Sequence, residues 1–404
     1  MKVLFVCAND PYFYDNGAAL RTRPFIQSVV KQGEAHLLSP SAKANETRLF
    51  SKRIDMEYKL HGRFVRTLRS VVTAEPDLLF RSRGGAVAKT LHATLLADEY
   101  DVVHIAGLQL AYLVGPFVDT TNYLRKHSET SSPALLVDEF NAEFAVYNRT
   151  NLRASRPFWQ SMYYQWQSRL LEAYEKRVLP IADLVTCPSQ EDMSLIKSIS
   201  PGANVSVIPS GIDLQKYDGA GLLPKAPVIT MIADYSYRPN REGMDWFLEH
   251  IYPAVRKANP NVRLYLVGKS SDRFDSVASG VIATGYVDDV VPYLQLARVV
   301  IAPLLSGGGI KMKVVEGMAA SRPVITTPIG AEGLKALNGR DIIVQSDPSV
   351  FADELVRLIR DDNDAARIAR NAYLFVSKLL SSDAVGRTYY EALNLVVSGS
   401  KSSD

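Results

Sequence analysis

The amino-acid sequence predicts an α/β protein with two domains, each built around a parallel β-sheet. The chain has 404 residues, which is more than a single hydrophobic core usually serves. Short apolar runs alternate with stretches of helical periodicity in both halves, as in β-α-β units. A segment rich in glycine and proline, 218–227, separates the halves. We therefore expect domains at 1–217 and 228–376, joined by this linker and facing each other across a cleft.

The composition is that of a globular protein with nearly balanced charge. Hydrophobic residues make up 47% of the chain and charged residues 22%, which is usual for soluble domains. The 46 basic and 43 acidic side chains leave a formal net charge of +3, which is no argument for nucleic acid as a partner. The cysteines are Cys7 and Cys187, so no disulfide framework is predicted. A reducing cytoplasm is the simplest interpretation. No window predicts a signal peptide or a membrane span, so any membrane contact is expected to be peripheral.

The first half contains short apolar runs that predict buried parallel strands. They lie at 2–7, 101–105, 134–137, 183–187 and 205–208. Gly17 opens a helix predicted to run to about Lys31, and a longer helix is predicted at about 157–179. His104 falls near the end of a strand, where open α/β sheets place their ligands.

Residues 58–83 interleave basic side chains with large apolar ones. The basic residues are Lys59, Arg63, Arg66, Arg69, Arg81 and Arg83, and Phe64, Val65, Leu68, Val71 and Val72 stand among them. Such a stretch can lie on an anionic membrane surface or hold a lipid-diphosphate acceptor. The alternative is an ordinary amphipathic helix with one solvated face.

The second half repeats the alternation of strands and helices. Strands are predicted at 228–232, 262–267, 281–284, 299–302, 324–327 and 342–344, and the chain is predicted to be helical from about 347 to 397. Repeated β-α units argue for a second parallel sheet covered on both faces.

Three consecutive glycines, Gly307, Gly308 and Gly309, precede a helix predicted at about 310–320. Glycines ahead of a helix allow close backbone approach, and the helix start favours an anion such as phosphate. Lys313 and Glu316 are three residues apart and so share a helix face. The lysine suits a diphosphate, and the glutamate suits the hydroxyls of a ribose. Alternatively, the two side chains form an ion pair on the surface. Lys311 is expected to point elsewhere and to tolerate alanine.

The segment 305–334 resembles the nucleotide-sugar-binding segment of the GT4-like retaining glycosyltransferases. It carries the pattern G-G-x-x-K-x-x-E-x-M-A-x-x-x-P-V-I-x-T and ends in Gly-Ala-Glu-Gly-Leu. The resemblance implies the GT-B fold, with 377–404 crossing back to the first domain. It also implies transfer of a sugar from a nucleoside-diphosphate donor, a UDP or GDP sugar, to a glycan or lipid-linked acceptor, without a further cofactor.

The same resemblance assigns roles to individual residues. Lys313 would bind the diphosphate and take part in catalysis, the Gly307–Gly309 loop would add N–H donors, and Glu316 would bind ribose. The other donor-binding candidates are Gly17 and Arg238 at the phosphates and Gly285 and Tyr286 near the base.

The chain departs from the family pattern at two positions. Gly308 stands where many relatives have a glutamate, and Phe140 where histidine is common; a phenyl ring cannot donate a hydrogen bond to a sugar hydroxyl. Asp138 and Glu139 remain as catalytic candidates, with Glu143 as a further carboxylate. Their alternative role is to cap or begin a helix.

No acidic pair predicts a metal site. Asp288–Asp289 resembles one but fits the start of a helix better, and Asp362 and Asp364 lie between helical segments, not after a strand. Two other functions stay open at this point: a nucleotide-sugar epimerase or hydrolase on the same fold, and a non-catalytic partner subunit of a glycan-assembly complex.

Overall fold

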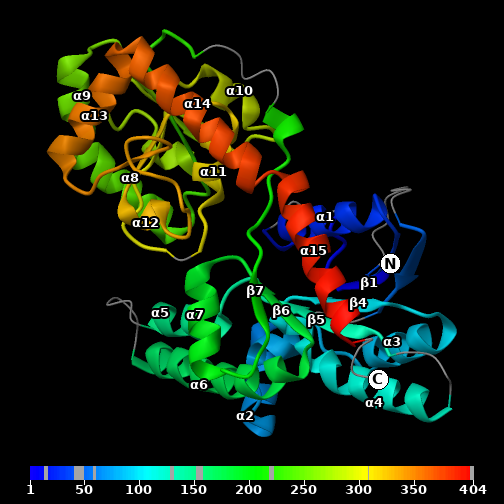
Figure 1. The fold of residues 1–404 in the computed structure, drawn as a ribbon. Coiled ribbons are helices and arrows are strands. Elements are labelled where there is room, and N and C mark those ends of the chain that lie inside the picture. Colours follow the sequence, from blue (N-terminus) through cyan, green and yellow to red (C-terminus); the bar gives the residue numbers. More distant parts are fainter. Residues whose placement is uncertain are drawn as a thin grey trace. The chain divides into compact units, whose positions relative to one another are not determined.

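The computed structural model describes residues 1–12, 17–40, 50–57, 61–127, 132–151, 158–217, 223–307 and 309–400. The chain forms two compact units. Unit 1 comprises Met1–Gly211 and Val385–Asp404, and unit 2 comprises Ile212–Ala384. Each unit is an α/β structure with helices on both faces of one sheet (Figure 1), which confirms the predicted fold class.

The sheet of unit 1 has seven parallel strands in the order β3-β2-β1-β4-β5-β6-β7. Their bounds are β1 Lys2–Cys7, β2 Glu34–Ser39, β3 Lys52–Asp55, β4 Val102–Ala106, β5 Ala134–Asp138, β6 Leu184–Cys187 and β7 Val205–Val207. The central strands β1, β4 and β5 are almost wholly buried. They read as continuous apolar runs because helices cover both faces.

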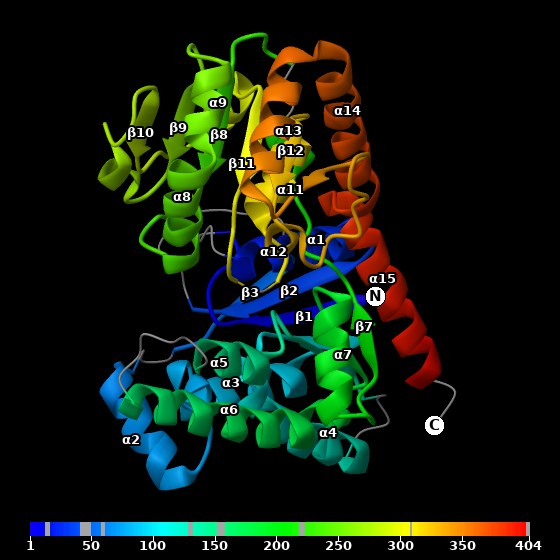
Figure 2. The same cartoon turned by 90° about the vertical axis from the view of Figure 1, so that its left-hand side faces the viewer.

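The helices of unit 1 cover the two faces of this sheet (Figure 2). They are α1 Gly17–Val30, α2 Arg63–Thr73, α3 Gly85–Ala97, α4 Val114–His127, α5 Glu143–Asn151, α6 Phe158–Val178 and α7 Gln190–Ile199, with 3-10 turns η1 Asp77–Arg81, η2 Leu108–Leu113 and η3 Leu179–Ile181. Separate apolar clusters lie on the two faces of the sheet. Ser189 caps α7, accepting a hydrogen bond from the backbone N–H of Asp192.

The sheet of unit 2 has six parallel strands in the order β10-β9-β8-β11-β12-β13. Their bounds are β8 Val228–Ile232, β9 Arg263–Val267, β10 Val281–Gly285, β11 Val299–Ala302, β12 Val324–Thr326 and β13 Ile343–Val344. The helical elements are η4 Leu214–Tyr217, α8 Arg238–His250, α9 Tyr252–Ala258, η5 Ser271–Phe274, α10 Val291–Leu296, α11 Met312–Ala319, α12 Pro328–Ala331, α13 Pro348–Arg360 and α14 Asp362–Leu379. In both sheets the strand order reverses next to the first strand of the unit, the position where such sheets bind ligands.

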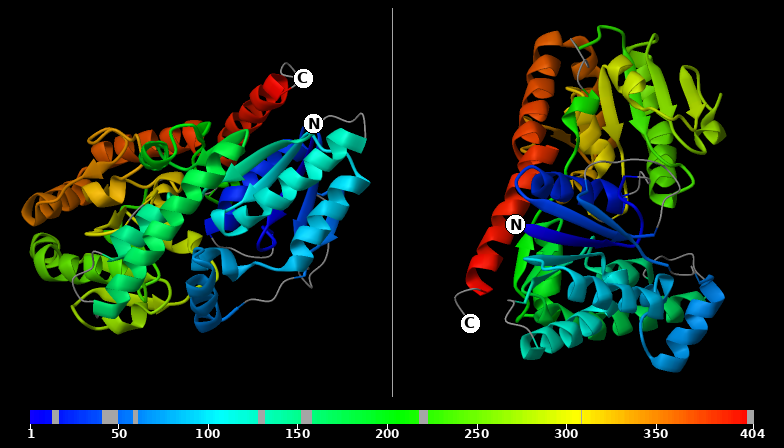
Figure 3. Two further views of the ribbon diagram at one scale, coloured as in Figure 1. Left: turned by 90° about the horizontal axis from the view of Figure 1, so that it is seen from below. Right: turned by 90° about the vertical axis from the view of Figure 1, so that its right-hand side faces the viewer.

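The last helix, α15 (Ser382–Ser400), begins in unit 2 and packs on unit 1 from Val385 onward (Figure 3). The ring of Tyr389 stacks on Phe25 of α1 at 4.3 Å between centroids, and its hydroxyl lies 2.7 Å from Nδ1 of His104. A small residue is needed where α15 meets α1, since a Cβ on Gly386 would lie 2.9 Å from the Pro24 carbonyl oxygen.

The observed division differs from the predicted one by a few residues. Unit 2 begins at Ile212, because the N–H of Ile212 donates to the Leu380 carbonyl at 2.8 Å and the Ile212 carbonyl accepts from Ser382 at 2.8 Å. Part of the predicted linker, 218–222, lies outside the described residues. No helix in the described part of the chain is long and apolar enough to cross a membrane.

Candidate functional site

A loop and a helix that follow β11 form the candidate site of unit 2. The loop leaves β11 after Ala302 and enters α11 at Met312. Gly307 has a φ of +130° and Gly309 a φ of +67°, conformations that residues with a side chain rarely adopt. Gly308 lies outside the described residues. The helix start has no side-chain cap, so its first N–H groups remain suited to an anion.

Lys313 lies in the first turn of α11 and reaches across to α8. Its ammonium donates to Oδ1 of Asn240, and the amide nitrogen of Asn240 donates to the Asp234 carbonyl at 2.7 Å. Burial lowers the pKa of Lys313 to about 8; the Glu316 charge opposes this shift and Lys311 adds to it. The side chain is therefore a partly desolvated cation held in a defined position.

Glu316 lies one turn further along α11 and has its own partner. The hydroxyl of Tyr217, in η4, donates to its Oε1 at 3.2 Å. Burial raises the pKa of Glu316, while Tyr217, Lys216 and Lys313 all act to lower it. No ion pair joins Lys313 to Glu316, both of them described residues; each is held by a residue from another element. The alternative of a surface ion pair is therefore wrong.

Lys311 points elsewhere than Lys313, since the two ammonium groups have different partners, but it is packed against the glycine loop. It is the N-cap residue of α11 and only 8% exposed. Its ammonium donates to the carbonyl of Gly309 at 2.5 Å and to Oε2 of Glu332 at 3.3 Å. Lys311 thus braces the glycine loop from within and ties it to the residue that follows α12.

The other donor-binding candidates of unit 2 lie at the start of α8 and at the end of β10. Arg238 begins α8 and donates to Oε1 of Glu242 at 2.5 Å. Gly285 ends β10, at the edge of the sheet, with a φ of +69°, and the following Tyr286 is 74% exposed. Their predicted contacts with phosphate and base stay predictions.

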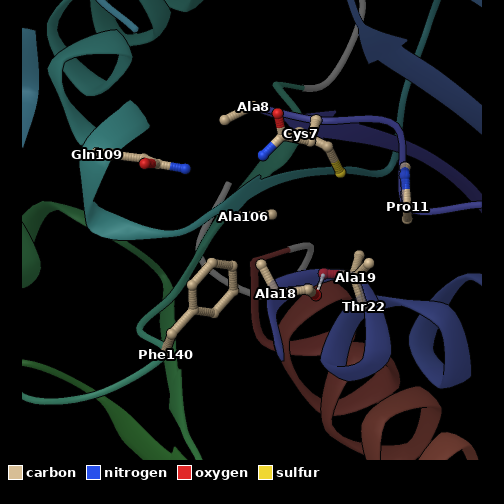
Figure 4. A pocket seen from close by; sticks show the side chains of 10 residues that line it. Cys7, Ala8, Pro11, Ala18, Ala19, Thr22, Ala106, Gln109 and Phe140 are labelled. Atoms are coloured by element: carbon tan, nitrogen blue, oxygen red, sulfur yellow. Dashed lines mark hydrogen bonds between the residues drawn. The ribbon is translucent and has the colours of Figure 1, made fainter. Parts of the chain in front are cut away.

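Unit 1 has a candidate site of its own, a cavity of about 380 Å³. Its lining includes Asn9, Gly17, Arg81, Ser82, Gly107, Gln109, Phe140, Glu143 and Tyr147. Figure 4 shows an adjoining smaller void that shares Gln109 and Phe140, and both side chains are directed toward it. Carboxylate, amide, guanidinium and phenol groups thus surround a space lined in part by an aromatic ring.

Phe140, in place of the family's histidine, packs against Gly107. Gly107 has a φ of +93°, and a Cβ there would lie 2.8 Å from Cε2 of the ring. An aromatic ring at the wall of a polar cavity offers an apolar surface for the C–H groups of a sugar but no hydrogen bond.

Asp138 does not line this cavity. Its carboxylate is fully buried and accepts hydrogen bonds from Arg21 Nε at 3.0 Å, from Arg21 Nη2 at 2.6 Å and from the Thr186 hydroxyl at 2.6 Å. Arg21 also donates to the Ile208 carbonyl at 2.6 Å. The pair therefore ties α1 to β5, β6 and the end of β7, and burial is incompatible with the direct catalytic contact predicted for Asp138.

Glu139 is likewise buried, and both of its carboxyl oxygens lack a hydrogen-bond partner among the described residues. Burial raises its pKa well above the usual range, and the neighbouring charge of Glu175 adds to this. Its burial excludes the direct catalytic contact predicted for Glu139. Glu143 is the carboxyl group that reaches the cavity; burial raises its pKa to about 7, with Arg81 opposing and Asp192 adding.

His104 is enclosed and does not reach a ligand surface. It is fully buried, Tyr389 contacts its Nδ1, and burial lowers its pKa to about 4. No group of three or more histidine, cysteine or acidic side chains in the described ranges is arranged to hold a metal ion.

Comparison with known proteins identifies the domain that carries Lys313. Residues 226–361 match the family of group 1 glycosyl transferases. Unit 2 contains a group 1 glycosyltransferase domain. An uncharacterized 44.6 kDa protein of the cps region of Klebsiella pneumoniae is 26% identical over 157 residues, which are 36% of this chain and 40% of that protein. A phosphatidyl-myo-inositol mannosyltransferase of Mycobacterium leprae (strain TN) is 28% identical over 172 residues, 40% of this chain and 46% of that protein.

The two sequence matches span less than half of the relatives' length. The similarity to solved structures covers nearly the whole chain. Sucrose-phosphate synthase of Thermosynechococcus elongatus superposes with a TM-score of 0.67 at 15% identity, over 99% of this chain and 100% of that one. HepE of Anabaena, solved in complex with UDP-glucose, superposes with a TM-score of 0.59 at 15% identity, over 98% and 99% of the two chains. The fold is therefore the GT-B fold.

Several residues of the glycosyltransferase domain's site escaped sequence reasoning. Asn240 and Tyr217 hold Lys313 and Glu316, and Glu332 holds Lys311. Glu332 is the acid of the Gly-Ala-Glu-Gly-Leu ending noted in the sequence, and Asn240 stands two residues after the donor-binding candidate Arg238. Tyr217 left no local signal, because its partner is 99 residues away.

Proposed function

We propose that the protein is a retaining glycosyltransferase that moves a sugar from a nucleoside-diphosphate donor to a glycan or lipid-linked acceptor. The observation that carries this proposal is the half-buried Lys313, positioned by Asn240 at the start of α11 within a group 1 glycosyltransferase domain. Bacterial polysaccharide or glycoconjugate synthesis is the context that we propose, and UDP or GDP sugars are the donors.

In this proposal Lys313 acts on the leaving group. When the bond between sugar and diphosphate breaks, negative charge grows on the departing diphosphate. An ammonium already desolvated and oriented stabilises that charge more than a solvated one would, because little reorganisation is needed. The N–H groups at the start of α11 add to the same effect, and Glu316 binds the ribose hydroxyls.

The acceptor binds the cavity of unit 1 in this proposal. The ring of Phe140 packs against the C–H face of a sugar. Gln109 and Glu143 form hydrogen bonds with the hydroxyls of that sugar. Gly17, at the start of α1, lines the same cavity. The protein is proposed to be cytoplasmic, with residues 58–83 as a contact with the inner face of the plasma membrane.

The test is product analysis with a panel of UDP and GDP sugars and a panel of glycan and lipid-linked acceptors. A new glycoside that forms only when donor and acceptor are both present supports the proposal, and NMR of its anomeric proton tests retention. Turnover of donor alone would indicate the epimerase or hydrolase instead, and donor binding without turnover would favour the non-catalytic partner. Because Lys313 and the helix start supply positive charge, activity should survive EDTA; loss on chelation and rescue by Mn²⁺ would contradict this.

A further inference from the structure

Helix α2 presents its apolar side to solvent. Phe64, Leu68, Val71 and Val72 stand at positions i, i+4, i+7 and i+8 and form one stripe along the helix. All four are between 55 and 81% exposed. A helix on a globular domain normally buries such a stripe, so this orientation requires a reason.

The polar side of α2 is the one that faces the protein. Ser70, the buried residue of the helix, accepts from Nε2 of Gln167 at 2.8 Å. The Thr67 hydroxyl donates to Tyr163 at 3.4 Å, and the Arg63 guanidinium lies 5.8 Å from the centre of the Tyr163 ring. These contacts fix α2 against α6 with its apolar stripe outward.

The start of α6, the helix that α2 contacts, has further exposed apolar side chains. Phe158, Trp159 and Met162 are 80, 66 and 55% exposed, and Tyr163, the next residue, is the one that contacts α2. Figure 2 shows α2 beside α6. We call these seven side chains, four from α2 and three from α6, the α2–α6 patch.

The charges on α2 itself are all positive. Helix α2 contains Arg63, Arg66 and Arg69 and no acidic residue. Next to it lies a cavity of about 630 Å³ whose charged and titratable lining is Glu57, His61, Arg69 and Arg83. A second copy of this chain docked on the patch would place like charges opposite each other, because a two-fold interface pairs a surface with itself. An anionic bilayer complements both the apolar stripe and the arginines.

We propose that the α2–α6 patch docks the protein on a membrane of anionic phospholipids. The apolar side chains enter the boundary between headgroups and acyl chains, and Arg63 and Arg69 meet the phosphates. This inference deepens the membrane contact proposed above for residues 58–83 and rests on that part of the proposed function; vesicle binding tests it separately from glycosyl transfer. Of the residues at 58–83, Lys59 lies outside the described part of the chain and is left out of the surface.

The test is binding of the full-length protein to phosphatidylcholine vesicles with and without phosphatidylglycerol. Wild type should bind only the anionic vesicles. The stripe variant Phe64→Ser/Leu68→Ser/Val72→Ser should bind at least tenfold more weakly, because burial of its apolar area is lost. The charge variant Arg63→Gln/Arg69→Gln should lose roughly fivefold per arginine, and added salt should weaken wild type more than this variant.

The matched control is Leu96→Ser/Ile181→Ser/Leu395→Ser, which removes three exposed apolar side chains from other surfaces of unit 1 and should bind like wild type. Equal thermal unfolding temperatures of all variants establish that each is folded. Absence of vesicle binding by wild type, binding unaffected by the stripe variant, or equal binding to neutral vesicles would overturn the proposal. Self-association that the stripe variant abolishes, without vesicle binding, would assign the patch to a second copy instead.

Discussion

Replacing Lys313 with alanine should weaken the binding of a nucleoside diphosphate and remove its pH dependence above neutrality. Hydrogen bonds that involve a charged group contribute about 1.5–3 kcal/mol, so the Kd of UDP should rise roughly 10- to 150-fold. If UDP is not the nucleotide of the donor, GDP should show the effect.

The pKa of Lys313, lowered to about 8, adds a signature that a merely structural lysine would lack. At pH 7 about nine-tenths of the side chains carry the proton, and at pH 9 about one-tenth. Because the last ionisation of phosphate lies near pH 6, the ligand's charge is constant in this range. Wild-type affinity should therefore fall about tenfold from pH 7 to pH 9, and that of the variant should not change.

Asn240 allows the reasoning to be tested further by isothermal titration calorimetry. Asn240→Ala removes the acceptor that positions the ammonium, so it should weaken binding on its own but add little to Lys313→Ala if it acts through Lys313. Lys257→Ala is the matched control, since Lys257 is in the last turn of α9, which precedes β9 and so lies at the opposite edge of the sheet. An unchanged Kd and pH dependence in Lys313→Ala would refute the assignment of this side chain to the diphosphate.

Three further outcomes are expected. Lys311→Ala should lower the affinity for the donor, because the Gly309 carbonyl and Glu332 lose the ammonium that they share. Lys311→Arg should restore part of that affinity. Wild-type affinity of the alanine variant would show that the loop does not depend on Lys311. Glu316→Gln should raise KM for the donor with little change in kcat, since ribose contacts are similar in the ground and transition states; a loss confined to kcat would count against this. Glu139→Gln should flatten the pH dependence of urea unfolding. Because the pKa of Glu139 is raised in the native state, that state binds more protons than the unfolded chain above about pH 4.5, and the free energy of unfolding of the wild type falls there by up to ~1.4 kcal/mol per pH unit. Equal slopes in the variant and the wild type would contradict the proposed burial effect.

Local pattern was sufficient for the elements and for the core of the nucleotide-binding segment. The runs at 2–7 and 228–232 became β1 and β8 with the predicted bounds, because a strand buried on both faces needs an uninterrupted apolar run. Gly307, Gly309, Lys313 and Glu316 could be placed at a loop and helix start, since side-chain direction follows helical spacing. The strands β2 and β3 were not predicted from the sequence.

Tertiary structure decided which charged groups are exposed and what each contacts. Asp138 lies at the end of β5, where a catalytic carboxylate could stand, yet Arg21, 117 residues away, forms a buried ion pair with it. Lys311 depends on Glu332 and Lys313 on Asn240, partners 21 and 73 residues distant. The stripe on α2 could be read from its spacing, but its outward direction was set by Ser70 and its contact with α6. Periodicity fixes the faces of an element relative to one another, and only packing against the rest of the chain determines which face is buried.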